Sequence, residues 1–228
     1  MSFLEIACFN PASAIIAQSN GASRIELCAN QSLGGTTPPL SDLISLKSQL
    51  TIPINVMIRT RGGNFVYSSD EVNEMKDEIE RFSTEGVDGF VFGVLDTEGK
   101  VDQVVCRELV SLCKSRGGTC TFHRALDEIP TEKMEDALEE IIELGFEAVL
   151  TSGGAKDAVG GGEVLKRLFQ TARGRIEIIV GGGVRSANLE GLMKETGAKW
   201  FHSSAIVEEG DIADGEEIGR LSCLLKRQ

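Results

Sequence analysis

The sequence predicts an α/β fold, a single (β/α)8 TIM-type barrel that spans residues 1–228. Eight short apolar runs alternate with amphipathic segments, and most runs are nearly continuous Val, Ile, Leu and Phe. Such runs are typical of parallel strands covered on both faces. Strand–helix alternation implies right-handed crossovers, and eight units close naturally into a barrel. A doubly wound open sheet is the alternative, because the pattern alone does not prove closure.

The strands are expected at short apolar runs bounded by polar or glycine residues: 3–7, 24–27, 54–58, 89–92, 120–123, 148–150, 176–180 and 200–202. Between them, apolar residues recur at helical spacing. The stripe of Val72, Met75, Ile79 and Phe82 follows a capping box from Ser68 to Glu71. Further helices are expected around residues 101–112, 134–142 and 164–169, with shorter ones near 15–16, 40–44, 189–193 and 218–225.

A weak internal repeat supports the barrel. Glycine followed by an apolar residue precedes a strand at residues 21–23, 86–88, 145–147 and 197–199. Glycine is the usual residue just past the end of a helix, and the next residue packs back on that helix. The repeats lie about two β-α units apart, which favours four quarter-barrels in one domain.

Composition limits the function classes. The chain is 41% hydrophobic, enough for one core, and its net charge of −12 disfavours nucleic-acid or anionic-lipid partners. No apolar run approaches the roughly 20 residues of a membrane helix, and the N-terminus shows no signal peptide. We therefore expect a cytoplasmic protein whose six cysteines are reduced thiols.

Functional groups of parallel α/β folds gather at the carboxyl ends of the strands. Nearly every expected strand end here is polar, reactive or glycine, and both histidines of the chain are among them. In order these ends are Cys8, Cys28, Arg59 with Arg61, Gly93, His123 with Arg124, Thr151 with Ser152, Gly181 to Gly183, and His202 with Ser203 and Ser204.

The last two strand ends suit an anion. Gly182 and Gly183 follow the seventh strand, and Ser203 and Ser204 follow the eighth. Barrels often bind phosphate at this place through backbone N–H groups and a helix N-terminus. The alternative is a tight turn that needs positive φ.

Two arginines follow the third strand. Arg59 and Arg61, with paired glycines after them, suit a loop that grips an anion or carboxylate at the barrel mouth. Alternatively, they pair with Glu5 and Glu26 across the barrel.

Acid–base candidates lie on the same rim. His123 precedes Asp127 by four residues, so a helical turn would let Asp127 orient the imidazole as in a general base. The same pair could equally form a static hydrogen bond. Glu26 and His202 complete the candidates, because Glu26 alternates with Arg24 and Cys28 on one strand face that is too polar to bury without partners.

Cys8 and Cys28 end the first two strands, which should be about 4.8 Å apart. Two thiolates there could share a soft ion such as Cu(I). Buried cysteines can equally serve as small hydrophobes. A parity problem also arises, since Glu5 and Cys8 fall on opposite faces of a regular strand. Either the first strand ends or bulges before Cys8, or Glu5 and Cys8 do not share a site.

The chain resembles the CutC copper-homeostasis family in motifs that cover nearly its whole length in one order. The matching segments are residues 4–8 (LEIAC), 21–28 (GASRIELC), 34–38 (GGTTP), 56–63 (VMIRTRGG), 88–95 (DGFVFGVL), 121–125 (TFHRA), 149–153 (VLTSG), 181–184 (GGGV) and 201–205 (FHSSA).

This resemblance implies a (β/α) barrel, a cytoplasmic location, a homo-oligomer (dimer or tetramer) and a role in copper tolerance. It also implies Cu(I) as the bound ion, with Cys8 and Cys28 as its ligands. A second hypothesis, from the residues themselves, is a barrel enzyme that acts on a small phosphorylated or anionic metabolite at the rim. The sequence identifies neither a reaction nor a substrate.

Overall fold

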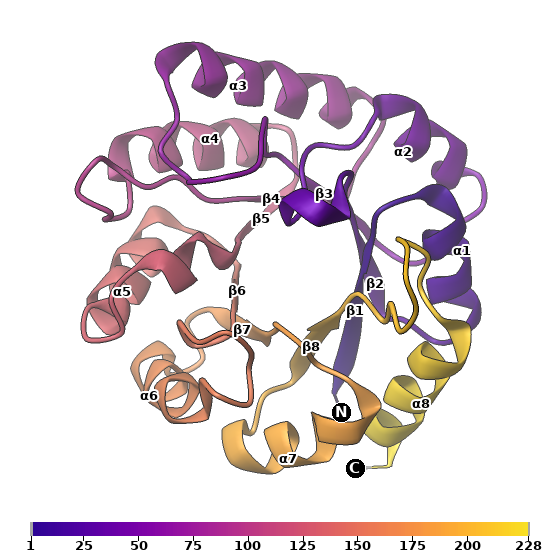
Figure 1. Ribbon diagram of the computed structural model, residues 1–228. Coiled ribbons are helices and arrows are strands. Elements are labelled where there is room, and N and C mark those ends of the chain that lie inside the picture. Colours follow the sequence, from indigo (N-terminus) through magenta and orange to yellow (C-terminus); the bar gives the residue numbers. More distant parts are fainter. Residues whose placement is uncertain (1, 228) are drawn as a thin grey trace.

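The computed structural model describes residues 2–227 and contains a closed barrel of parallel strands surrounded by helices (Figure 1). The strands pair in sequence order from β1 to β8, and β8 pairs back with β1. The (β/α)8 barrel predicted from the sequence is therefore confirmed, and the open doubly wound sheet is wrong.

The strands are short and their bounds differ from the predicted ones by at most one residue at either end. They are β1 (Phe3–Cys8), β2 (Arg24–Leu27), β3 (Ile54–Met57), β4 (Gly89–Phe92), β5 (Thr119–Phe122), β6 (Ala148–Thr151), β7 (Glu177–Val180) and β8 (Trp200–Ser203).

A helix follows every strand, and two short 3-10 turns, η1 and η2, lie in loops at the barrel mouth. The helical elements are α1 (Pro11–Ser19), η1 (Gln31–Leu33), α2 (Leu40–Lys47), α3 (Ser69–Thr84), α4 (Gln103–Ser115), η2 (Arg124–Glu128), α5 (Met134–Leu144), α6 (Gly162–Ala172), α7 (Ser186–Thr196) and α8 (Gly215–Lys226).

Local sequence signals explain where helices begin and end. The Ser68 side chain accepts the Glu71 N–H while Glu71 caps the Ser68 N–H, so the predicted capping box is confirmed. The four repeated glycines, at positions 21, 86, 145 and 197, all have positive φ at the ends of helices. In the helix expected around residues 101–112, the apolar stripe that includes Val101, Val104, Val105, Leu109 and Leu112 was predicted to face the core; this was wrong in part, because Val104 of α4 is 69% exposed and α4 buries Cys106, Leu109, Val110 and Cys113.

Alternation along the strands separates two layers. Outward side chains such as Phe92 and Phe122 pack under the helices in one large apolar core, where both lie against Phe146 with ring centroids 5.2 and 5.3 Å away. Inward side chains form two small apolar clusters instead. The barrel interior is thus left with room for polar residues, which the helix-covered layer could not hold cheaply.

The strand register puts those polar residues side by side. Glu5 of β1 lies opposite both Arg24 of β2 and His202 of β8, so one carboxylate bridges the three strands at the closure of the barrel. Glu26 stands one layer nearer the mouth, opposite Ala7 and Asn55. The predicted polar face of β2 therefore points into the barrel.

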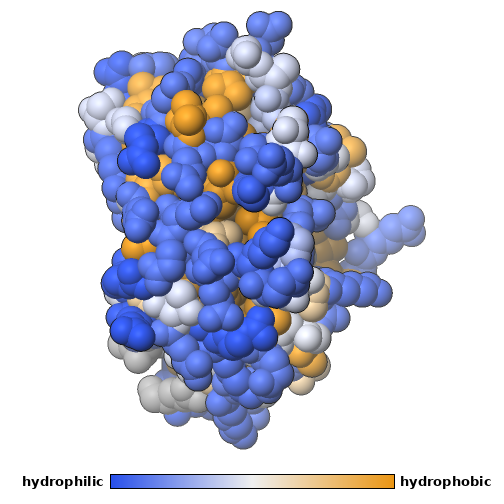
Figure 2. All heavy atoms as spheres, turned by 90° about the vertical axis from the view of Figure 1, so that its left-hand side faces the viewer, coloured by the Kyte–Doolittle hydropathy of each residue, from blue (hydrophilic) through white to orange (hydrophobic). Residues whose placement is uncertain are grey.

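The outer surface in Figure 2, over the side of the barrel that carries α4 to α6, is largely hydrophilic with small apolar spots. Within residues 2–227, no helix is both long enough and apolar enough to cross a bilayer.

The two layers predict unequal costs for truncating apolar side chains. Phe122 is fully buried, so Phe122→Ala should lower the free energy of unfolding by about 3–5 kcal/mol. Val104→Ala, on the exposed face of α4, should change it by less than about 0.5 kcal/mol. Urea unfolding followed by circular dichroism measures both, and equal effects would contradict the assigned layers.

Candidate functional site

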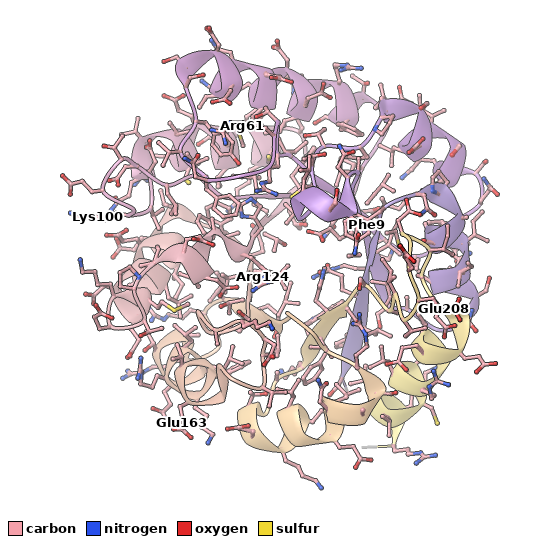
Figure 3. All side chains as sticks on the ribbon, in the orientation of Figure 1. Phe9, Arg61, Lys100, Arg124, Glu163 and Glu208 are labelled. Atoms are coloured by element: carbon pink, nitrogen blue, oxygen red, sulfur yellow. The ribbon has the colours of Figure 1, made fainter. Side chains whose placement is uncertain are left out.

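One cavity of about 250 Å³ opens at the carboxyl ends of the strands. Its wall includes Glu26 and Cys28 from β2 and the residue after it, His123 after β5, Gly182 and Gly183 after β7, and His202, Ser203 and Ser204 at the end of β8. The sequence-predicted residues Glu26, His123 and His202 therefore meet at one rim. Figure 3 shows Arg124 reaching over the barrel mouth and Phe9 beside η1 at the opposite side of it.

A chain of polar side chains crosses the barrel below the mouth. Arg24 pairs with Glu5, and Glu5 Oε1 lies 2.7 Å from His202 Nδ1. On the other edge of the ring, His202 Nε2 lies 3.7 Å from Glu26 Oε2. The Arg24 guanidinium also stacks over the Trp200 ring, with 4.0 Å to its centroid. The ion pair between Arg24 and Glu5 stabilises both buried charges.

These contacts separate the pKa values of the two carboxylates. Burial raises the pKa of Glu5, but Arg24 and His202 outweigh it and bring that pKa to about 2. Burial raises the pKa of Glu26 to about 7 against the opposing attraction of His202. Burial lowers the pKa of His202, yet the hydrogen bond to Glu5 and the charge of Glu26 raise it above its ordinary value.

His123 is buried with a defined tautomer. Its Nδ1 accepts the Ala125 N–H at 3.2 Å, so the ring proton resides on Nε2. Burial, reinforced by the charge of Arg59, lowers the pKa of His123 to about 3, so the ring is neutral at ordinary pH. The Nε2 atom is buried and has no hydrogen-bond partner within residues 2–227.

Asp127 does not orient His123, so the predicted pair is wrong. The Asp127 carboxylate instead accepts from the backbone N–H of Ser152 and Gly154, from the Thr151 hydroxyl and from Arg124 Nε at 2.7 Å. The 3-10 turn η2 directs Asp127 toward the β6 end rather than back to β5. Asp127 is therefore a loop-fixing group behind the cavity.

The two arginines after β3 have different positions. Arg59 lines the cavity, but its guanidinium donates to the carbonyls of Leu33, Gly35 and Gly63 at 2.8 Å each and stacks over Phe65. Neither Arg59 nor Arg61 pairs with Glu5 or Glu26, so that alternative is wrong.

Arg61 lies outside the cavity, contrary to its predicted role as an anion ligand. It pairs with Glu71 of α3 and donates to the Val66 carbonyl at 2.7 Å. Figure 3 shows it away from the mouth, near α3 and α4. The glycine turn after it carries the chain toward α3, and the guanidinium caps that turn.

The predicted anion site has the geometry of an anion cradle. Gly182 and Gly183 have φ of 95° and 70°, and a Cβ on Gly182 would meet Ser152 at 2.9 Å. The N–H groups of Gly182, Gly183 and Ser204 find no acceptor within residues 2–227. Unpaired N–H groups in a turn form a nest for anions. The Arg124 guanidinium lies within 3.6 Å of the same Cβ position.

Arg185 closes the other side of the cradle. Its guanidinium donates to Ser203 Oγ at 2.9 Å and to Ser204 Oγ at 3.3 Å, and it lines the cavity. The predicted helix N-terminus does not take part: Glu217 accepts from the backbone N–H and hydroxyl of Ser186 at the start of α7. Positive charge here comes from two guanidinium groups.

The predicted ligand cysteines point to opposite faces of the sheet. Cys8 pairs with Leu27 in register and packs in the outer core, whereas Cys28 packs inside the barrel with Met57 and lines the cavity. β1 stays regular through Cys8, so Glu5 and Cys8 do not share a site. A shared ion between the two thiols does not fit this arrangement. No group of three or more His, Cys, Asp or Glu side chains within the described chain could hold a metal ion.

Comparison with known proteins identifies the family. The CutC family model matches residues 2–207. The chain belongs to the CutC family. The human copper homeostasis protein cutC homolog is 42% identical over 202 residues, which cover 89% of this chain and 72% of that protein. The mouse homolog is 43% identical over a similar span, 89% of this chain and 73% of its own. CutC membership supports a copper-related role.

A solved CutC structure has the same fold. The CutC structure from Streptococcus agalactiae superposes with a TM-score of 0.83 at 32% identity and covers 90% of this chain and 99% of its own. N-(5'-phosphoribosyl)anthranilate isomerase from Pyrococcus furiosus matches at a TM-score of 0.68 and 17% identity, covering all of both chains, and shows the shared barrel alone.

Of the three cavity arginines, Arg124 was placed at the rim from the sequence but given no role as a ligand, and Arg185 was not identified at all. Arg124 directly follows the predicted His123, and Arg185 comes one residue after the Gly-Gly-Gly-Val run. A basic residue next to each rim motif is the signal that could have identified them. Met57 gives no such signal, because it resembles any other apolar strand residue.

The environment of His123 predicts a pH-dependent stability. From pH 6.5, its reference pKa, down to about 3, the unfolded chain binds a proton that the folded chain excludes. Stability from a neutral His123 is thus present above pH 6.5 and lost on acidification. On going from pH 7 to pH 5, wild type should lose about 2 kcal/mol more unfolding free energy than His123→Gln.

Urea unfolding of both proteins at the two pH values measures this difference. His202→Gln is the matched control, because the pKa of His202 is raised. Stabilisation by His202 is complete below pH 6.5 and lost as pH rises, so its difference from wild type should change with the opposite sign. A pH-independent difference for His123→Gln would show that the ring titrates in the folded protein as it does in the unfolded chain, and would contradict a buried, neutral ring.

Proposed function

We propose that the cavity of this CutC-family protein binds, and acts on, a small phosphorylated or otherwise anionic metabolite. The observation that carries this proposal is the cradle at the mouth, where the N–H groups of Gly182, Gly183 and Ser204, unpaired within the described residues 2–227, lie between the guanidinium groups of Arg124 and Arg185. N–H groups and arginines together are the donors that recognise phosphate and carboxylate oxygens.

The local charge contrasts with the whole molecule. The chain has a net charge of −12, yet three arginines, Arg59, Arg124 and Arg185, line this one cavity. Burying a cation near a protein cavity is costly unless it is hydrogen-bonded or faces an anion. Each guanidinium is held by carbonyls, hydroxyls or a carboxylate, which fixes its position for a ligand.

Removing a cavity arginine tests anion binding. Isothermal titration with inorganic phosphate should show binding to wild type, and Arg124→Gln should weaken it about tenfold or more, because a charge-assisted hydrogen bond contributes roughly 1.5–3 kcal/mol. Arg61→Gln is the control, because Arg61 is held by Glu71 outside the cavity. No phosphate binding to wild type, or equal loss in both variants, would contradict the proposal.

A second candidate function is Cu(I) binding through cysteine thiolate. Family membership supports it, together with the position of the Cys28 thiol in the cavity wall next to Met57. Thiolate and thioether are the soft ligands that select Cu(I). Burial and the nearby Glu26 charge raise the pKa of the Cys28 thiol, so Cu(I) must displace its proton.

Single variants separate the two cysteines. Under reducing conditions, Cys28→Ser should abolish Cu(I) binding, whereas Cys8→Ser should leave it nearly unchanged, because Cys8 faces the helix layer. Cys223→Ser, on the exposed face of α8, controls for adventitious thiols. Competition with a Cu(I) chelator reports the affinity. Undiminished stoichiometry in the Cys8→Ser, Cys28→Ser double variant would exclude Cys8 and Cys28 as Cu(I) ligands.

We also propose that the protein works in the cytoplasm as a homo-oligomer, a dimer or tetramer. The six free cysteines support a reducing compartment. Exposed apolar side chains, Ile15 on α1, Ile44 on α2 and Ile212 in the loop before α8, lie on neighbouring elements and support a contact between copies.

A further inference from the structure

Within residues 2–227, three cavity-lining residues have a buried side-chain polar atom without a partner: His123 Nε2, Glu26 Oε1 and Arg59 Nε. His123 and Glu26 are each 3% exposed. A buried donor or acceptor left unpaired costs roughly 1–3 kcal/mol. Such groups in a cavity therefore indicate what the missing ligand supplies.

His123 Nε2 and Glu26 Oε1 require different ligand atoms as hydrogen-bond partners. The Nδ1 atom of His123 accepts a hydrogen bond from the Ala125 N–H and therefore carries no proton. The ring proton is on Nε2, which is an N–H donor in a fixed position. A ligand atom there must be an acceptor, as a carbonyl oxygen is. Glu26 Oε1 suits a hydroxyl, which donates to a carboxylate and accepts from a carboxylic acid.

Two aromatic neighbours and a glycine hold the His123 ring in place. Phe65 packs on it at 4.7 Å between ring centroids, and Phe122 approaches its edge at 6.2 Å. Gly93 leaves room, because a Cβ there would come within 2.7 Å of Nδ1. The ring thus cannot rotate freely to find a protein acceptor, and its Nε2 stays without a partner among residues 2–227 in a residue that lines the cavity.

The cavity also limits ligand size. Its volume of about 250 Å³ lies below the roughly 300–1,000 Å³ of pockets for drug-sized ligands. A phosphate group with a few carbon atoms fits such a volume better than a nucleotide does.

We propose that the metabolite is a small phosphorylated hydroxy-carbonyl compound. Its phosphate lies on the N–H groups of Gly182, Gly183 and Ser204, its carbonyl oxygen accepts from His123 Nε2–H, and its hydroxyl contacts Glu26. This inference rests on the anion site proposed above and adds the carbonyl and hydroxyl. A neutral imidazole N–H on a carbonyl oxygen polarises that carbonyl.

A pair of matched ligands tests the carbonyl contact. Dihydroxyacetone phosphate and glycerol 3-phosphate share the phosphate and differ mainly in carbonyl against hydroxyl. Wild type should bind dihydroxyacetone phosphate about tenfold more tightly by isothermal titration. His123→Phe, which keeps a ring but has no N–H, should reduce this preference to about one while inorganic phosphate binds as before.

An infrared measurement gives a readout that a structural role would not change. The carbonyl stretch of dihydroxyacetone phosphate labelled with carbon-13 at its carbonyl should shift to lower frequency on wild type and not on His123→Phe. Should His123→Phe fail to fold, the wild-type shift and the wild-type preference still decide. Arg124→Gln should weaken the binding of dihydroxyacetone phosphate and of glycerol 3-phosphate equally, so the preference for dihydroxyacetone phosphate should remain.

The outcomes separate this inference from the anion site. Binding of phosphate and of both ligands with equal affinity and no infrared shift would overturn the carbonyl contact and leave the anion site intact. Binding of none of the three would overturn both.

Discussion

The buried Glu5 carboxylate is the constraint on which the site depends. It lies at the seam where β1 closes on β8 and contacts Arg24 on one side and His202 on the other. An ionised carboxylate without partners could not remain at 1% exposure in this interior. Because three strands supply the ion pair, the same interaction that balances the buried charge also fixes the direction of the His202 ring toward the cavity.

Charge is arranged in layers along the barrel axis. Carboxylates and His202 occupy the interior below the mouth, and guanidinium groups from three loops stand around the opening. A small molecule with an anionic end and a polar uncharged end matches this order. The glycines after β7 matter here because Gly182 and Gly183 have positive φ, a conformation in which L side chains would be strained.

The copper-related role of the family and the geometry of the cavity meet at Cys28. Its thiol shares the wall with Glu26, Met57 and the histidine side chains, so a metal ion and a metabolite would compete for overlapping space. Cys8 is separated from that wall by the sheet itself. Of the two cysteines, only Cys28 therefore lines the cavity at the mouth.

The sequence by itself determined the alternation of strands and helices, the strand positions and the rim that carries Glu26, His123, His202, Gly182 and Ser204. These features follow from local periodicity, since the period of a strand and the end of a helix are set by near neighbours. Closure of the eight strands into a barrel, by contrast, was decided by the pairing of β8 with β1. Tertiary structure alone decided that Cys8 faces the helices, that Asp127 binds the β6 end and not His123, and that Arg61 pairs with Glu71. Those partners are chosen by strand register and loop path, which bring together residues that no local pattern relates.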